Sequence, residues 1–107
     1  WGLTAAPIRF DPPRQTAEAV RAADPSTLKI PGLQGVPVAL LTGEASVFAS
    51  FASSIIPFLQ HAGAQVEHLD LPAFGIHGNG HGLIYERNSD EVFEVVKQWL
   101  ARCCPAA

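Results

Sequence analysis

The sequence predicts an α/β fold with about three parallel strands and flanking helices. Strand-like segments alternate with helix-like segments along the chain, which is the order that produces a parallel sheet. One of these segments, residues 36–42, is apolar almost throughout, as expected of a strand covered on both faces. A chain of 107 residues, 48% hydrophobic and 16% charged, is one small globular domain or a piece of a larger one.

The N-terminal third holds the first expected strand, residues 2–10, which ends at Asp11. Pro12 and Pro13 follow, and proline has no N–H to donate to a strand ladder. Residues 16–24 suit two helical turns with Thr16 as the N-cap. The second expected strand is the apolar run 36–42.

A longer helix is expected over residues 47–62, begun by Ser46 or Ser50 and ended by Gly63. Pro57 should kink this helix or limit its N-terminal half. Its apolar residues recur at helical spacing, and the phenylalanines among them are expected in the core: Phe48, Phe51 and Phe58.

The last third predicts a strand over residues 64–72 and a final helix over residues 88–103. In the strand, Val66, His68 and Asp70 alternate with Glu67 and Leu69, so that the two sets face opposite sides. The helix can be capped by Asn88, Ser89 or Asp90, and its apolar stripe is expected to be buried: Val92, Val95, Val96, Trp99 and Leu100.

Composition excludes several classes of partner. The net charge is −3 and no run of lysine or arginine forms a phosphate-binding surface, so nucleic acid is not expected to bind. The longest apolar stretches are too short to span a membrane. The chain contains no methionine and opens directly on a strand-like segment, so we expect it to be part of a longer protein. Nothing in the sequence indicates its compartment.

Polar residues follow each expected strand at its carboxyl end, where ligands and catalytic groups gather in open α/β sheets. Asp11 follows the first strand, Glu44 follows the second, and a glycine-rich loop with His77 and His81 follows the third. Adjacent strands lie only about 4.8 Å apart, so a carboxylate and an imidazole from different strand ends can meet. This combination suits an acid that orients a histidine, which in turn activates a nucleophile.

The segment "HLDLPAFGIHGNGHGLIYERNSDEVFEVVKQWL" resembles the C-terminal part of an α/β-hydrolase, with a last strand, a histidine loop and a final helix. Within it, "PAFGIHGNGH" followed by a helix that begins "RNSDEV" is similar to the sequence of one esterase branch of that family. The resemblance implies that residues 1–107 are the C-terminal portion of a single hydrolase domain and that His81 is the catalytic histidine. It also implies hydrolysis of a small-molecule ester without a metal or organic cofactor.

The resemblance leaves the acid of the triad open between two residues. The family's usual position, after the penultimate strand, is Glu44, whereas the esterase branch places its acid one strand earlier, at Asp11, which we rank first. The G-x-S-x-G nucleophile motif is absent, so the nucleophile is expected in an N-terminal part of the same hydrolase, acting as partner. His77 and Phe74 are expected to shape the loop or to line the substrate pocket.

Two other interpretations stay open from the residues alone. A zinc site could combine His77 and His81 with Asp70 or His68, although two histidines on a glycine-rich loop have no fixed mutual geometry. A non-catalytic α/β module could instead bind another chain through an open sheet edge. A nucleophile motif upstream of Trp1 would favour the hydrolase, and a true terminus at Trp1 would favour the interaction module.

Overall fold

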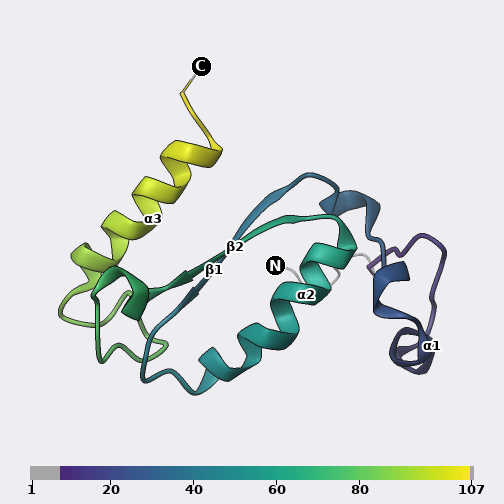
Figure 1. Cartoon of the computed structure of the whole chain (residues 1–107), viewed down its shortest axis with the longest axis horizontal. Coiled ribbons are helices and arrows are strands. Elements are labelled where there is room, and N and C mark those ends of the chain that lie inside the picture. Colours follow the sequence, from purple (N-terminus) through teal and green to yellow (C-terminus); the bar gives the residue numbers. More distant parts are fainter. Residues whose placement is uncertain (1–7, 107) are drawn as a thin grey trace.

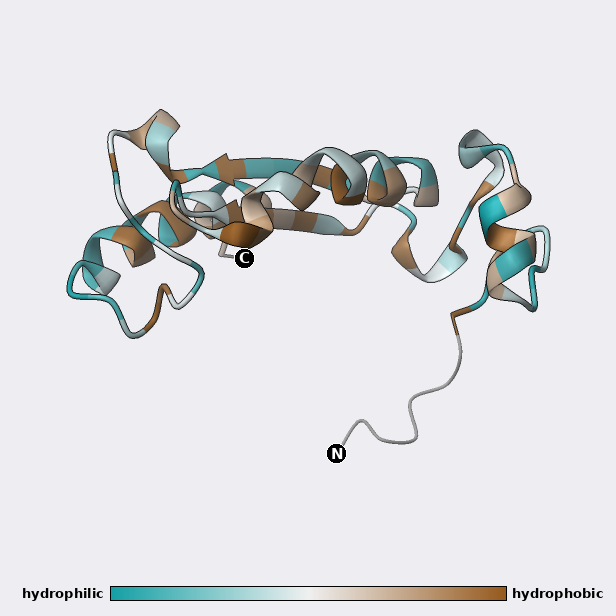
Figure 2. Cartoon of the chain, turned by 90° about the horizontal axis from the view of Figure 1, so that it is seen from below, coloured by the Kyte–Doolittle hydropathy of each residue, from teal (hydrophilic) through white to brown (hydrophobic). Residues whose placement is uncertain are grey.

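The computed structural model describes residues 8–106 and has the α/β architecture that the sequence predicts (Figure 1). Strands β1 (Pro37–Thr42) and β2 (Gln65–Asp70) form a parallel two-stranded sheet. Helix α2 (Ala52–Ala62) connects them, and helix α3 (Ser89–Cys103) follows β2 after a long loop. The two helices lie on opposite sides of the strand pair (Figures 1 and 2).

The prediction of about three parallel strands is corrected to two within residues 8–106. Most of the expected first strand lies outside the described residues, and residues 8–10 have no regular structure. Asp11 instead forms an isolated antiparallel bridge with Lys29, whose carbonyl oxygen accepts the Asp11 N–H at 2.9 Å. Pro12 and Pro13 explain why this bridge does not continue, since neither can donate to a ladder.

The sheet alternates as predicted, and one of its faces makes the core. The register runs from Pro37 opposite Gln65 to Thr42 opposite Asp70. Leu69 is 1% exposed and belongs to a cluster that also contains Val92 and Val95 of α3. The remaining members of the cluster, buried or partly buried, are Leu71, Ile76, Ala39, Leu41, Leu83 and Trp99. The final helix therefore packs on this face through Val92, Val95 and Trp99 of the predicted stripe, whereas Val96 is only partly buried and Leu100 is exposed.

The segment before β2 confirms two of the expected helix boundaries. Ser46 caps a short 3-10 helix (Val47–Phe51), accepting the N–H of Phe48, and α2 follows from Ala52. Gly63 ends α2 with a left-handed φ of 110°, a conformation that glycine adopts without strain. Pro57 lies within α2, so regular α-helix extends only five residues ahead of it (Ala52–Ile56), as expected of a helix that proline limits.

The expectation that the phenylalanines of this segment are buried is wrong for two of them. Phe48 and Phe51 are 54% and 51% exposed, and both lie on the 3-10 helix, which has no buried residue, and not on α2. Helix α1 (Ala17–Ala22) is capped by Thr16 as predicted, and lies at the other end of the structure from α3 (Figure 1). Among residues 8–106, no helix is long and apolar enough to cross a membrane.

Candidate functional site

The loop between β2 and α3 folds against the residues that follow β1, at the carboxyl edge of the sheet. Glu44 holds the first half of this loop: one oxygen accepts the Gly78 N–H at 2.9 Å, and the other lies 3.3 Å from His77 Nδ1. The Gly78 N–H, and after it the His77 imidazole, lower the pKa of Glu44 below its ordinary value. Glu44 is therefore a carboxylate that anchors the loop in its ionised form.

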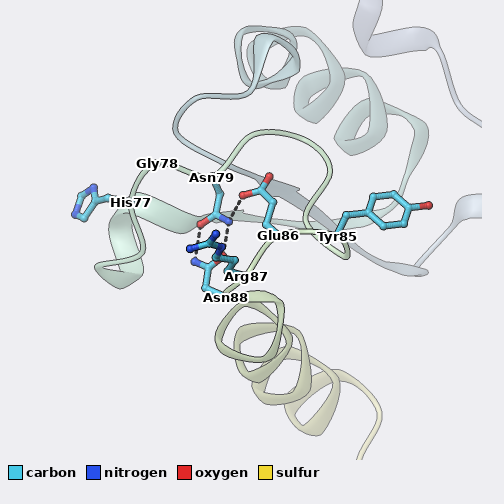
Figure 3. Close-up of a pocket in the computed structure, with 7 residues that line it drawn as sticks. All are labelled: His77, Gly78, Asn79, Tyr85, Glu86, Arg87 and Asn88. Atoms are coloured by element: carbon cyan, nitrogen blue, oxygen red, sulfur yellow. Dashed lines mark hydrogen bonds between the residues drawn. The ribbon is translucent and has the colours of Figure 1, made fainter.

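Glu86 holds the second half of the loop in the same manner (Figure 3). Its Oε1 accepts the Gly80 N–H at 2.9 Å, and its Oε2 accepts a hydrogen bond from the Asn79 side-chain amide. Asn79 is only 2% exposed and forms a reciprocal amide pair with Asn88, the N-cap of α3, with distances of 2.7 and 2.9 Å. Sequence reasoning missed Asn79 and Glu86 as site residues, and anticipated Asn88 only as a possible helix cap.

Glycines in the loop after β2 and in the segment after β1 are needed for two different reasons. Gly75 and Gly78 have left-handed φ values of 76° and 84°, which favour glycine. Gly43 is required for close approach instead: a Cβ there would lie 2.5 Å from the Gly80 carbonyl oxygen and nearer still to that of Asn79. The same Asn79 oxygen accepts the Ala45 N–H at 2.8 Å. The chain after β1 and the loop after β2 are thus in direct backbone contact.

His81 is exposed at this edge of the sheet, directly after the anchored residues. Its ring meets the Phe48 ring edge-on, with centroids 4.9 Å apart and planes at 88°. Within residues 8–106, no hydrogen bond or ion pair joins His81 to either predicted acid, since the carboxylate of Glu44 is bound to His77 and Gly78. The structure therefore brings Glu44, His77 and His81 to one edge without pairing Glu44 with His81.

Asp11 lies at the opposite end of the sheet. Its partner Lys29 is followed by Ile30, whose N–H donates to Ala62 at the C-terminus of α2, just before β2 begins. Each strand has six residues, so at about 3.3 Å per residue the two ends of the sheet lie roughly 17 Å apart. In this arrangement Asp11 does not approach His81.

The two residues expected to shape the loop or line the pocket are both exposed at the carboxyl edge. Phe74 ends a short 3-10 helix (Leu71–Phe74) after β2 and is 45% exposed. His77 lines a hollow of about 460 Å³ together with Tyr85, Glu86 and Arg87. In Figure 3 its ring points away from the cluster of Asn79, Glu86 and Asn88.

A second polar cluster, at the end of the strands, was not predicted. The buried Thr42 hydroxyl donates to Asp70 at 2.9 Å and lies 2.8 Å from His68 Nε2, which must then be the donor to it. The only sequence signal was that His68 and Asp70 fall on the same side of the predicted strand over residues 64–72. Within the described part of the chain, no group of three histidine, cysteine or acidic side chains could hold a metal ion.

Comparison with known proteins gives a distant relative among curated proteins. The chain is 32% identical to a probable secreted lipase, phiG, from a fungal species (strain ATCC 74256), over an alignment of 119 positions that covers 95% of the chain. The chain spans about a third of the length of that relative, 32%. No family model and no solved structure matches the chain. The chain is thus a distant homologue of a lipase-like protein, consistent with part of an α/β-hydrolase.

Proposed function

We propose that residues 1–107 are the C-terminal portion of an α/β-hydrolase domain that hydrolyses carboxylic esters, with His81 as its general base. The observation that carries this proposal is the position of His81, on an anchored loop at the carboxyl edge of a parallel sheet, where such folds gather their catalytic groups. The relative described as a probable secreted lipase supports the same chemistry.

The nucleophile in this proposal is a serine of the N-terminal part of the same hydrolase, because this chain has no G-x-S-x-G motif. His81 accepts the serine hydroxyl proton while the serine oxygen bonds to the ester carbonyl carbon, and returns that proton to the departing alcohol oxygen. A water oxygen then bonds to the acyl carbonyl carbon while His81 takes the water proton and passes it to the departing serine oxygen, which frees the carboxylic acid and restores the serine hydroxyl. The reaction needs no oxidant, metal or organic cofactor.

We assign the triad acid to Asp11 and give Glu44 an anchoring role. Glu44 already accepts from Gly78 and approaches His77, and using it as the acid would dismantle that anchor. Asp11 reaches His81 only in an arrangement in which its bridge to Lys29 is broken and its segment lies along the outer edge of β1, which is unpaired within residues 8–106. The rest of the hydrolase would hold that segment in place. His77 and Phe74 would line the pocket for the ester.

The test replaces His81 by alanine in the protein encoded by the complete open reading frame, with hydrolysis of p-nitrophenyl esters as the assay. Loss of a triad member lowers kcat by roughly 10⁴- to 10⁶-fold. His61→Ala is the matched control, because His61 lies at the C-terminal end of α2, away from the loop. Full turnover by the His81→Ala variant would contradict the assignment.

The acid is tested in the same background by comparing Asp11→Asn with Glu44→Gln. Asp11→Asn is expected to lower kcat nearly as far as His81→Ala does, because an amide cannot stabilise the imidazolium. Glu44→Gln is expected to have the smaller effect, since it weakens the anchor and leaves the proton transfer in place. The reverse order would make Glu44 the acid.

A second function is favoured by the open edge of β1 and the exposed Phe48 and Phe51. A non-catalytic module would use this surface to bind another chain by strand addition. That reading requires that the open reading frame lack a nucleophile motif and that the protein hydrolyse no ester. The first is read from the complete open reading frame, and the second comes from the p-nitrophenyl ester assay described above.

A further inference from the structure

The backbone directly before His81 is fixed by a carboxylate that the proposed catalytic steps do not use. Gly80 is the residue adjacent to His81, and its N–H donates to Glu86 Oε1 at 2.9 Å. The other oxygen of Glu86 accepts from the Asn79 side chain. Glu86 therefore binds two consecutive residues of the loop at the point where the His81 side chain begins.

This carboxylate is connected to the buried core through two asparagine side chains. The Asn79 amide gives one hydrogen to Glu86 and the other to Asn88 Oδ1 at 2.7 Å, while its oxygen accepts from Asn88 Nδ2 at 2.9 Å (Figure 3). Asn88 begins α3, whose Val92 and Val95 are buried in the core against β2. Asn79 and Asn88 thus connect the loop to the core and fix its position.

A carboxylate suits this position because both of its partners are donors. Its two oxygens accept from Gly80 and Asn79 at once, and hydrogen bonds to an ionised acceptor are roughly twice as strong as neutral ones. Glutamine at the same position would turn its NH₂ group toward one of the two donors. One hydrogen bond would be replaced by a contact between donors.

We propose that Glu86 is the positioning residue for His81: by holding Gly80 and Asn79 it sets the place from which the imidazole reaches the reacting hydroxyl. This proposal rests on the function proposed above. A displacement of about 1 Å in a catalytic group can lower the rate roughly 100-fold. Glu86 touches neither substrate nor the reacting atoms in this role, and acts only through His81.

The test is Glu86→Gln in the protein encoded by the complete open reading frame, assayed on p-nitrophenyl butyrate from pH 5 to 9. We expect kcat to fall about 10- to 100-fold while KM changes less than about threefold, because proton transfer is impaired and ester binding is not. Hydrogen exchange of residues 77–83 should accelerate. Glu86→Asp, which keeps the charge, should recover part of kcat.

Glu94→Gln is the matched control, since Glu94 pairs with Lys97 at 2.7 Å on the exposed side of α3. It should leave kcat, KM and loop exchange at parental values. A double-mutant cycle separates positioning from folding: Glu86→Gln should cost nothing further in a His81→Ala background. If Glu86→Gln does not fold, Glu86→Asp, which keeps the charge but shortens the side chain that holds Gly80 and Asn79, takes its place, with a smaller fall in kcat expected.

A Glu86→Gln variant with the parental kcat would overturn the positioning role. So would a Glu86→Gln substitution that lowers kcat by the same factor in the parent and in the His81→Ala background. Failure of the proposed function has a different signature: no variant, nor the parent, hydrolyses esters. The loop would then be judged by exchange alone. Faster exchange of residues 77–83 in Glu86→Gln would support the anchor, and unchanged exchange would overturn it.

Discussion

Replacing Gly43 by alanine is expected to separate the two segments that form the candidate site. The new Cβ would lie 2.5 Å from the Gly80 carbonyl oxygen, whereas ordinary contacts begin at 3.4 Å, so the loop must retreat by about 1 Å. Overpacking of this kind costs about 1–3 kcal/mol. Loss of the hydrogen bond from Ala45 N–H to the Asn79 oxygen, now 2.8 Å, adds about 1 kcal/mol.

The expected decrease in the free energy of unfolding is therefore about 2–4 kcal/mol, measured by urea denaturation. Gly32→Ala is the matched control, because a Cβ there meets nothing within 4 Å and its φ is not left-handed. It should change stability by less than about 0.5 kcal/mol, or increase it slightly. Equal stability of the two variants would refute the inference that this close approach fixes the loop.

Three further outcomes are expected. Leu69→Ala, at a site 1% exposed in the core, should lower the free energy of unfolding by about 2–5 kcal/mol in urea, and Ile84→Ala, at a site 79% exposed, by much less. The pKa of Glu44 in the folded protein lies below its ordinary value of 4.5. The stability that the ionised Glu44 carboxylate contributes by holding the loop should therefore be fully present above pH 4.5 and lost as the pH falls through the lowered value. Hydrogen exchange of the Gly78 N–H, followed by NMR, should accelerate in this acidic range. Glu44→Gln should abolish this pH dependence.

The parts of the fold that depend on near neighbours in the chain could be predicted from the sequence. The caps at Thr16 and Gly63 involve residues within one or two turns, and both are found where expected. The alternation of β2 was also readable, because a strand covered on one face must repeat every two residues. These features need no knowledge of which distant segments meet.

The features that failed or were missed depend on such distant meetings. Asp11 was assigned to the carboxyl edge because its strand was assumed to be parallel, whereas in the structure it bridges Lys29 at the other end. The pairing of Asn79 with Glu86 and Asn88 was missed because polar residues around a glycine-rich loop carry no pattern that says which of them face one another. The position of His81 was expected because its loop follows a strand at the carboxyl end, and the ring lies at that edge of the sheet.

The exposed phenylalanines connect the stability of the chain to its proposed chemistry. A two-stranded sheet is marginal on its own, and within residues 8–106 one edge of β1 is unpaired and Phe48 is half exposed against the His81 ring. A hydrolase would place its nucleophile and pocket walls on this same surface, so that Phe48 and the imidazole lose water together. An interaction module would need only the edge of β1 covered and would leave the imidazole in solvent. The accessibility of His81 in the assembled protein therefore discriminates between the two functions, independently of any assay for hydrolysis.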